Sequence, residues 1–395
     1  MNKPKLIRIT TIPLSLRVLL KGQLRFMSEH FEVVGVSSAG SDLEEVHKNE
    51  GIRVEAIEMT RQITPVQDLI SLWKLYRWLK NEKPQIVHTH TPKAGIIGML
   101  AAKLAGVPHR LHTVAGLPLM ESTGIKRTIL NFVEKMTYRA ATKVYPNSKG
   151  LYDFILANHY TKAAKLKVIG EGSSNGIDTS FFSPEVVSEK ENLALKQSLG
   201  IKQDDFVFVF VGRLVGDKGI NELVSAFSQL KTQNSQPPTH NPQLKTHNSK
   251  LLLVGPLETA LDPLNPETLR EIESNPNILS VGFQKDVRPY FAISDALVFP
   301  SYREGFPNVV LQAGAMGLPA IVSDINGCNE IIVENENGII IPPKSTVDLQ
   351  NAMRKLLANN EVYTKLAGNA RPMILSRYEQ MEVWKEILEE YKAMI

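Results

Sequence analysis

A series of short, continuously apolar runs, separated by stretches with helical periodicity, constrains the fold of this chain more than any other feature. In the first half the runs are 6–11, 33–37, 86–90, 110–114 and 143–146, and in the second half they are 206–211, 251–254, 296–300, 320–322 and 338–341. Continuous apolarity is typical of parallel strands that helices cover on both faces. The sequence therefore predicts the α/β class, with two doubly wound, Rossmann-like parallel sheets.

The length and the turn residues divide the chain into domains. A chain of 395 residues exceeds the size at which one hydrophobic core keeps growing, and turn-forming residues at 175–178 and 183–184 precede a polar helix. We expect an N-terminal domain at 1–180, a C-terminal domain at 181–365 and a helical segment at 366–395. Apolar residues at helical spacing between 362 and 394 predict one long terminal helix, which we expect to return to the N-terminal domain. Within 231–250, a duplicated polar motif predicts a mobile surface insertion.

The charges and the single cysteine limit the classes of function. Residues 1–180 hold 25 Lys and Arg against 15 Asp and Glu, whereas residues 181–395 hold 20 against 26. A basic half can attract an anionic substrate, an anionic membrane surface or nucleic acid. No zinc-finger spacing or aromatic RNA-binding signature supports nucleic acid. Cys328 has no disulfide partner within the chain, and neither a signal peptide nor a membrane-spanning apolar run stands out, so we expect a cytoplasmic protein.

A glycine-rich turn after the predicted strand at 206–211 carries residues suited to bind phosphate. Gly212 and Gly219 bracket a segment that contains Arg213 and Lys218, two cations that can flank a diphosphate. A surface turn with solvated Arg and Lys is the alternative. Taken alone, this turn leaves both interpretations open.

The loop at 300–308 also follows a predicted strand and precedes a helical run. Pro307 suits the first position of a helix, so the backbone N–H groups of Asn308, Val309 and Val310 would form an anion cradle. Glu304 stands just before this helix and either contacts a ligand or caps the helix. Because the carboxyl ends of parallel strands bind ligands, this loop is a second candidate for the site.

In this order, the motifs resemble the retaining nucleotide-sugar glycosyltransferases of family 4, which have the two-domain GT-B fold. The resemblance covers nearly the whole chain. Its most specific parts are Gly-Arg-Leu at 212–214 with Lys-Gly at 218–219, Arg-Glu-Gly-Phe-Pro at 303–307 with Gln-Ala at 312–313, Asn-Gly-Cys-Asn-Glu at 326–330 and Asn-Gly-Ile-Asp at 175–178. Segments 10–16, 88–95 and 112–116 look like the bacterial members that extend undecaprenyl-diphosphate-linked glycans. The resemblance implies two domains that face a central cleft.

The resemblance also implies a role for each matching residue. The catalytic residues would be Glu304, Arg213, Lys218 and His112, with the two cations neutralising the donor diphosphate and the other two contacting the transferred sugar. The donor site would consist of Gly212, Arg213, Lys218, Phe283, Glu304, Gly305, Phe306, Pro307, Asn308, Val309 and Gln312. Gln312 replaces the second glutamate of the family's paired-glutamate motif, and its amide can still bond ribose hydroxyls.

In the N-terminal domain, the resemblance implies that the acceptor side is lined by Thr11, Pro13, Ser15, His90 and Lys93. For His88, His90 and His112, the alternative is a hydrogen-bonded histidine at the end of a strand. Both interpretations of these histidines remain open from the sequence.

The function that this resemblance implies is the transfer of a hexose or N-acetylhexosamine from a UDP-sugar to a lipid-diphosphate-linked saccharide. The sequence has no Asp-x-Asp pair and no His, Cys and carboxylate cluster at metal-ligand spacing, so we expect no bound metal and no cofactor besides the UDP-sugar substrate. Two alternatives are a nucleotide-sugar 2-epimerase on the same fold and a non-catalytic sugar-nucleotide-binding protein. The 303–307 motif and the acceptor-like segments argue against the epimerase.

Residues 125–144 predict a basic amphipathic helix. Phe132 and Met136 fall on one face, whereas Lys135, Arg139 and Lys143 share a stripe at i, i+4 and i+8. Such a helix either packs on the core with solvated lysines or binds an anionic membrane surface. The basic first half favours the membrane, and we expect a peripheral protein at the inner face of the cell membrane.

Overall fold

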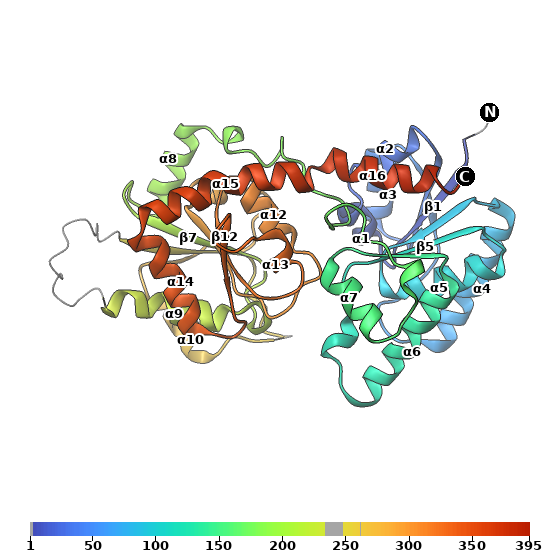
Figure 1. Cartoon of the computed structure of the whole chain (residues 1–395), viewed down its shortest axis with the longest axis horizontal. Coiled ribbons are helices and arrows are strands. Elements are labelled where there is room, and N and C mark those ends of the chain that lie inside the picture. Colours follow the sequence, from blue (N-terminus) through green and yellow to red (C-terminus); the bar gives the residue numbers. More distant parts are fainter. Residues whose placement is uncertain (1–2, 234–247, 261) are drawn as a thin grey trace. The chain divides into compact units, whose positions relative to one another are not determined.

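A computed structural model describes residues 3–233, 248–260 and 262–395, and within them the chain forms two parallel six-stranded sheets with helices on both faces (Figure 1). The contacts divide the chain into a first unit, Met1–Gly176 with Gln380–Ile395, and a second unit, Ile177–Glu379. The predicted α/β class and its two doubly wound sheets are confirmed.

The sheet of the first unit has the strand order β3-β2-β1-β4-β5-β6. The strands are β1 (Lys5–Ile9), β2 (Glu32–Ser37), β3 (Arg53–Ala56), β4 (Ile86–Thr89), β5 (His109–Val114) and β6 (Lys143–Pro146). This order reverses direction between β1 and β4, and ligands of doubly wound sheets bind at that switch point. The loops after β1 and β4 are therefore the expected place for a ligand in this unit.

Side chains of β1 alternate between two apolar layers of the first unit. Ile7 and Ile9 point into the layer beneath α4 (Pro65–Glu82), α5 (Pro92–Leu104), α6 (Gly124–Ala140) and α7 (Lys149–Ala157). Leu6 points into the opposite layer, which α1 (Pro13–Leu19), α2 (Gln23–Ser28) and α3 (Ser41–Glu50) cover. Burial on both faces explains why the strands read as continuous apolar runs.

The C-terminal part of the chain is two helices, α15 (Asn360–Tyr378) and α16 (Gln380–Lys392), and not the single helix that the periodicity predicts. Glu379 adopts an extended conformation (φ −55°, ψ 129°) that ends α15. The apolar face of α16 completes the second layer of the first unit through Val383, Ile387, Leu388 and Tyr391. The predicted return of the terminal helix to the N-terminal domain is thus confirmed for α16, whereas α15 belongs to the second unit.

The sheet of the second unit has the order β12-β11-β10-β7-β8-β9, which is the same topology. Its strands are β7 (Phe206–Val211), β8 (Ser249–Val254), β9 (Ile278–Ser280), β10 (Ala296–Phe299), β11 (Ala320–Ser323) and β12 (Gly338–Ile341). Its remaining helices are α8 (Glu189–Ser198), α9 (Ile220–Gln233), α10 (Pro266–Ser274), α11 (Arg288–Ala292), α12 (Asn308–Ala315), α13 (Cys328–Ile331) and α14 (Thr346–Ala358). Here the switch point lies between β7 and β10.

Short 3₁₀ turns connect some of these elements: η1 (Pro118–Glu121), η2 (Ala163–Lys165), η3 (Pro184–Val186) and η4 (Gly216–Lys218). The predicted insertion at 231–250 overlaps the end of α9 and the start of β8, and its central part, 234–247, lies outside the described residues. None of the described helices is long and apolar enough to span a bilayer.

Candidate active site

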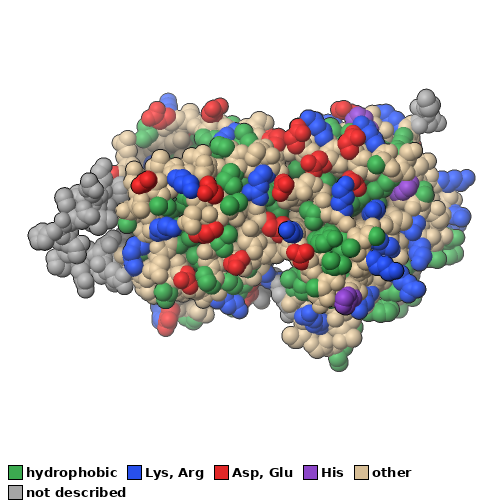
Figure 2. Space-filling view, viewed as in Figure 1, with side chains coloured by type: hydrophobic (Ala, Val, Ile, Leu, Met, Phe, Trp, Pro, Cys, Tyr) green, Lys and Arg blue, Asp and Glu red, His purple; other side chains and the backbone are tan. Residues whose placement is uncertain are grey.

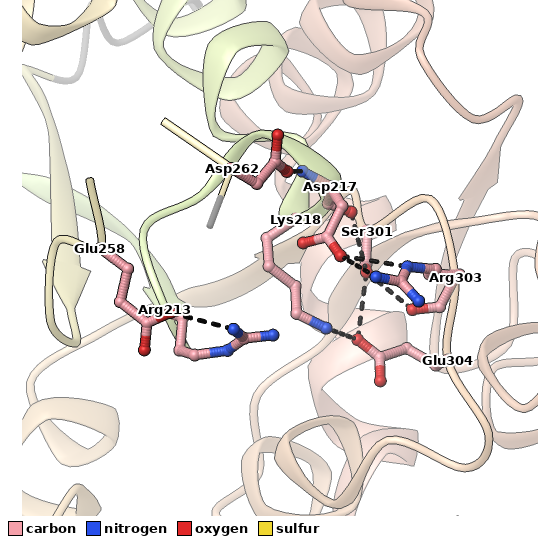
Figure 3. A network of polar contacts seen from close by, with 8 residues as sticks. All are labelled: Arg213, Asp217, Lys218, Glu258, Asp262, Ser301, Arg303 and Glu304. Carbon is pink, nitrogen blue, oxygen red and sulfur yellow. Dashed lines mark hydrogen bonds and ion pairs between the residues drawn. The ribbon is translucent and has the colours of Figure 1, made fainter. Parts of the chain in front are cut away.

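The carboxyl ends of β7 and β10 bring the two predicted phosphate-binding loops of the second unit together. The turn at 212–219 follows β7, the loop at 300–307 follows β10, and the two strands pair in parallel. Tyr302 donates its backbone N–H to the carbonyl of Asp217 at 2.9 Å, which ties one loop to the other. Figure 3 shows the polar contacts that result.

An ion pair between Lys218 and Glu304 lies at the centre of this site (Figure 3). Both side chains are largely buried, with exposed fractions of 16% and 19%. The hydroxyl of Ser301 donates to the same carboxylate oxygen of Glu304 at 3.0 Å. Because Glu304 binds these partners and α12 has no side-chain cap, the interpretation of Glu304 as a helix-capping acid is wrong.

Two further ion pairs lie beside the first (Figure 3). Arg213 donates to Glu258, in the loop after β8, at 3.0 Å, and about half of its side chain is exposed. Asp217 accepts from Arg303 at 2.7 and 3.0 Å, and its backbone N–H donates to Asp262 at 2.6 Å. The two cations expected to flank a diphosphate thus each bind a carboxylate.

The turn that presents Lys218 depends on Gly219. Its backbone is left-handed (φ +71°), and a Cβ atom there would lie 2.2 Å from the carbonyl oxygen of Pro300. A glycine therefore lets η4 approach the end of β10 closely enough for the Lys218 side chain to reach Glu304.

The loop at 326–330 binds the backbone of the loop at 300–307. Asn326 donates to the carbonyl oxygens of Glu304 and Gly305, at 3.3 and 2.5 Å. Gly327 is left-handed (φ +76°), and a Cβ atom there would lie 2.6 Å from the Gly305 oxygen. The 326–330 motif thus shapes the backbone that carries Glu304.

The start of α12 differs from the sequence prediction by one residue. Pro307 is the N-cap and Asn308 the first helical residue. The backbone N–H of Val310, expected to be available to an anion, donates to the Pro307 carbonyl at 3.1 Å. The predicted anion cradle is therefore limited to the backbone N–H groups of Asn308 and Val309. Gln312 lies one turn after Asn308 and is half-buried.

Three other residues of the predicted donor site, Phe306, Phe283 and Gly212, lie in different surroundings. Phe306 packs edge-on against Tyr378, with ring centroids 5.5 Å apart. Phe283 follows the edge strand β9, and its side chain is exposed. Gly212 adopts φ +152° and is approached by Gly255, where a Cβ atom would lie 1.8 Å from the Gly212 oxygen.

Cys328 is buried at the start of α13. Burial is the main cause that raises the pKa of its thiol well above the usual value, and the Glu304 charge adds to the effect. A thiol that stays protonated is a poor nucleophile.

In the first unit, the loops after β1 and β4 are joined by two threonines. Thr11 and Thr91 bond through their hydroxyls at 2.7 Å, and the N–H of Thr11 donates to Thr91 at 2.9 Å. Lys93 pairs with Asp68 at 2.5 Å. Pro13 opens α1, and Ser15 lies in its first turn. All five residues expected on the acceptor side, His90 included, therefore follow β1 or β4 at one switch point.

His112, in β5, is buried against α5. Its Nδ1 lies 2.7 Å from the hydroxyl of Thr89, and a Cβ atom on Gly95 would lie 2.6 Å from the imidazole. Burial lowers the pKa of His112 to about 4. The imidazole is therefore neutral at physiological pH and can exchange hydrogen bonds but carries no charge.

His88 and His90 are buried and hydrogen-bonded, as the alternative interpretation describes. His88 contacts the hydroxyls of Tyr391 and Thr113 at 2.5 and 2.8 Å, and Nε2 of His90 accepts from Arg8 at 2.9 Å. Burial holds the pKa of both histidines well below the usual range. His90, the fifth expected acceptor residue, thus presents its ring to the interior.

Sequence reasoning missed several partners of the site residues. Ser301, Asp217 and Arg303 lay inside recognised motifs without an assigned role, and Glu258 and Asp262 were not singled out. Glu258 could have been identified from its position, because it lies in the loop after β8, as Arg213 lies in the loop after β7. Among the described residues, no group of three or more His, Cys, Asp and Glu side chains is arranged to hold a metal ion.

Comparisons with known proteins support one family. Residues 191–373 match the family model of glycosyl transferases group 1, and residues 24–172 match a glycosyl transferase 4-like domain. A capsular polysaccharide biosynthesis glycosyltransferase of Staphylococcus aureus is 31% identical over 397 residues, covering 100% of this chain and 98% of the relative. An Escherichia coli UDP-Gal:alpha-D-GlcNAc-diphosphoundecaprenol alpha-1,3-galactosyltransferase is also 31% identical, over 85% of this chain and 82% of the relative.

Solved structures with the same fold include Anabaena HepE in complex with UDP and glucose. It superposes with a TM-score of 0.79 at 19% identity and covers 99% of this chain and all of that one. The lipopolysaccharide glycosyltransferase WaaG superposes with a TM-score of 0.66 at 14% identity, over 96% of this chain and 98% of that one. Since nearly the whole chain superposes on these neighbours, and the sequence matches extend over both units, this chain belongs to the group 1, family 4 glycosyltransferases of the GT-B fold.

Proposed function

We propose that this glycosyltransferase moves a hexose or N-acetylhexosamine from a UDP-sugar to a polyprenyl-diphosphate-linked saccharide, with retention at the anomeric carbon, in the synthesis of a bacterial surface polysaccharide. The observation that carries the proposal is the buried Lys218–Glu304 pair at the switch point of the second unit. The names of the relatives from S. aureus and E. coli support the kind of acceptor.

In this proposal the donor diphosphate takes the place of Glu304 and Glu258 beside Lys218 and Arg213. The bond from the anomeric carbon to the UDP oxygen breaks, and a bond from that carbon to an acceptor hydroxyl oxygen forms on the same face. The hydroxyl proton passes to the departing diphosphate oxygen, so UDP leaves with its charge stabilised by the two cations. Glu304, once released, accepts hydrogen bonds from hydroxyls of the transferred sugar.

The deciding assay uses a synthetic polyprenyl-diphosphate-linked N-acetylglucosamine and a panel of radiolabelled UDP-sugars. We expect label from one of them in the lipid fraction, with the anomeric configuration of the donor retained in the product's NMR spectrum. A 2-epimer of the UDP-sugar formed without acceptor would identify the epimerase instead. Binding of UDP-sugar without transfer, hydrolysis or epimerisation would identify the non-catalytic alternative.

We further propose that transfer needs no divalent metal, because Lys218 and Arg213 supply positive charge where the diphosphate would lie. Activity measured after exhaustive treatment with EDTA should equal that of the untreated enzyme. Loss of activity that one divalent ion alone restores would contradict this part of the proposal.

Gln312 stands where the family has its second glutamate, and we expect Gln312→Glu to keep kcat/KM within roughly tenfold of the parent. The change removes at most one hydrogen-bond donor to the ribose hydroxyls. Gln197→Glu, on the exposed surface of α8, is the matched control for the added charge. A thousandfold loss in Gln312→Glu alone would show that the amide itself is required.

The membrane part of the proposal rests on the outward face of α6. Ile125, Ile129 and Phe132 are exposed, by 82%, 42% and 64%, whereas the acidic side chain of Glu134 is buried on the opposite, core-facing side. Exposed cations, Lys126, Lys135 and Arg139, stand on either side of this apolar stripe. An apolar face between cations suits the interface of an anionic bilayer.

Helix α4 repeats this pattern on the other side of α5, which packs against both helices. Its outward face exposes Val66, Leu69, Ile70 and Trp73 together with Lys74, Arg77 and Lys80. Figure 2 shows hydrophobic side chains among Lys and Arg side chains on the surface of the first unit. Both stripes would let the basic unit rest on a bilayer that holds the acceptor.

One cation of the predicted stripe is not part of it. Helix α6 ends at Ala140, and Lys143 opens β6, where its ammonium donates to the Ala164 carbonyl at 3.3 Å. A membrane test of α6 therefore replaces Lys126 and not Lys143.

Replacing Lys126, Lys135 and Arg139 together by Gln should weaken binding to vesicles that contain anionic lipid by about 3 kcal/mol, near 1 kcal/mol per charge. Lys202, Arg354 and Lys365, exposed cations of the second unit, form the matched triple control. Vesicle co-sedimentation at low salt measures the effect, and turnover on a short soluble acceptor should stay unchanged. Equal binding by the parent and the α6 variant would mean that this helix does not contact the bilayer.

A further inference from the structure

A buried arginine without a carboxylate partner lies inside the first unit. Arg8, in β1, is 1% exposed, and none of the ion pairs found among the described residues includes it. Its Nε donates to His90 at 2.9 Å and its Nη2 to the side-chain oxygen of Gln23 at 2.5 Å. Both partners are neutral, and the ring of Tyr391, 5.9 Å away, offsets the charge only in part.

A cavity of about 20 Å³ adjoins this guanidinium. Four buried polar atoms of residues that line it have no hydrogen-bond partner: Nη1 of Arg8, Nδ1 of His90, Oδ1 of Asn147 and Oγ of Ser174. Roughly 10–15 Å³ is enough for one water molecule, so the cavity can hold one ligand of about that size. Four unsatisfied atoms on residues that line one small cavity point to a ligand, since buried polar groups are seldom left without partners.

The chemistry of these atoms favours an anion over a neutral ligand. Because Nε2 of His90 accepts from Arg8, the neutral imidazole carries its proton on Nδ1, which is therefore a donor. Arg8 Nη1 and the Ser174 hydroxyl are donors as well, and a half-turn of the Asn147 amide presents its NH₂ group. Water would satisfy these bonds but would leave the charge of the buried arginine uncompensated, which is unfavourable in a protein interior.

We propose that this cavity binds one small inorganic anion of the size of chloride, held by Arg8, His90 and Ser174. The anion would join the end of β1, the end of β4 and the loop at 173–175. Gln23, which holds the other side of the guanidinium, donates to the Ser174 carbonyl and to Asn175 at 3.1 and 3.0 Å. Asn175 in turn accepts from Trp384 of α16 at 2.7 Å. The anion would therefore stabilise the docking of α16 in the first unit, and this inference does not depend on the proposed reaction.

Crystals of the full chain grown in sodium bromide provide a direct test. We expect an anomalous bromine peak within hydrogen-bond distance of Arg8 Nη1 and Ser174 Oγ. Density at this position without anomalous signal would identify a water molecule and overturn the proposal.

Thermal unfolding provides a second test in solution, at constant ionic strength, with sodium gluconate exchanged for sodium chloride. Gluconate is too large for the cavity, so Tm should rise by about 2–8 °C as chloride increases, with the logarithm of the chloride concentration once that exceeds the Kd. Ser174→Ala should need roughly tenfold more chloride for the same rise, because it loses one donor. Ser28→Ala, at a half-buried serine of α2, is the matched control.

Arg8→Met should lose the chloride response altogether, and if that variant does not fold, Ser174→Ala alone decides. Equal Tm values in the two salts would overturn the proposal. So would an identical chloride response of the parent and Ser174→Ala, because the rise would then be a general effect of the salt.

Discussion

Lys218→Ala should lower kcat by about 10² to 10³ while leaving the Tm nearly unchanged. Lys218 lies at the centre of the candidate site, bound to Glu304 and largely buried, and its removal takes away a preorganised charge where negative charge develops on the leaving diphosphate. Arg213→Ala has the same expected sign and scale, because Arg213 carries the neighbouring positive charge. Steady-state kinetics with saturating donor and acceptor give kcat.

The control for Lys218→Ala is Lys365→Ala, which also removes a lysine bound to a glutamate, Glu336, in the same unit but at an exposed position. Ion pairs at the surface contribute little to stability, so this variant should behave as the parent. Lys218→Arg should recover part of the lost activity because it restores the charge with a different geometry. Near-parental turnover in both Lys218→Ala and Arg213→Ala would end the assignment of the diphosphate site.

Gly219→Ala should destabilise the second unit by about 3 kcal/mol or more and lower kcat by about 10². The left-handed backbone costs an alanine roughly 1–2 kcal/mol, and a Cβ atom 2.2 Å from the Pro300 oxygen forces η4 and the end of β10 apart. That movement separates Lys218 from Glu304, and a misplacement of about 1 Å can cost 10² in rate.

Gly200→Ala separates the conformational cost of Gly219→Ala from the cost of its steric clash with Pro300. Gly200 is also left-handed (φ +65°), but nothing lies within 4 Å of a Cβ atom there, so only the conformational cost of about 1–2 kcal/mol applies. Calorimetry reports unfolding of both units, whereas tryptophan fluorescence reports the first unit alone, because Trp73, Trp78 and Trp384 all lie in it. The fluorescence transition should stay unchanged in both variants. Equal stability of Gly219→Ala and Gly200→Ala would mean that the close approach to Pro300 adds nothing to the free-energy cost of the substitution.

Much of the fold and the candidate site could be predicted from the sequence for a simple physical reason. Strands that helices cover on both faces must be continuously apolar, so most strands of both sheets were predicted to within a few residues. Parallel strands place their carboxyl ends along one edge, so loops such as 212–219 and 300–307, which are distant in sequence, are expected to meet there. The edge strands β3 and β9 were not predicted, because their half-exposed residues break the apolar run.

By itself, then, the sequence determined the fold class, the family and which loops converge, because these depend on local periodicity and on motifs. Only the tertiary structure decided which partner each polar side chain takes, since those contacts join residues far apart in the chain. Arg213 binds Glu258, Lys218 binds Glu304, and Arg8 lies in a cavity with His90 and Ser174. The tertiary structure also decided the break at Glu379 between α15 and α16. It decided which face of α6 points outward, because periodicity gives the angle between side chains on a helix but not the side on which the core lies.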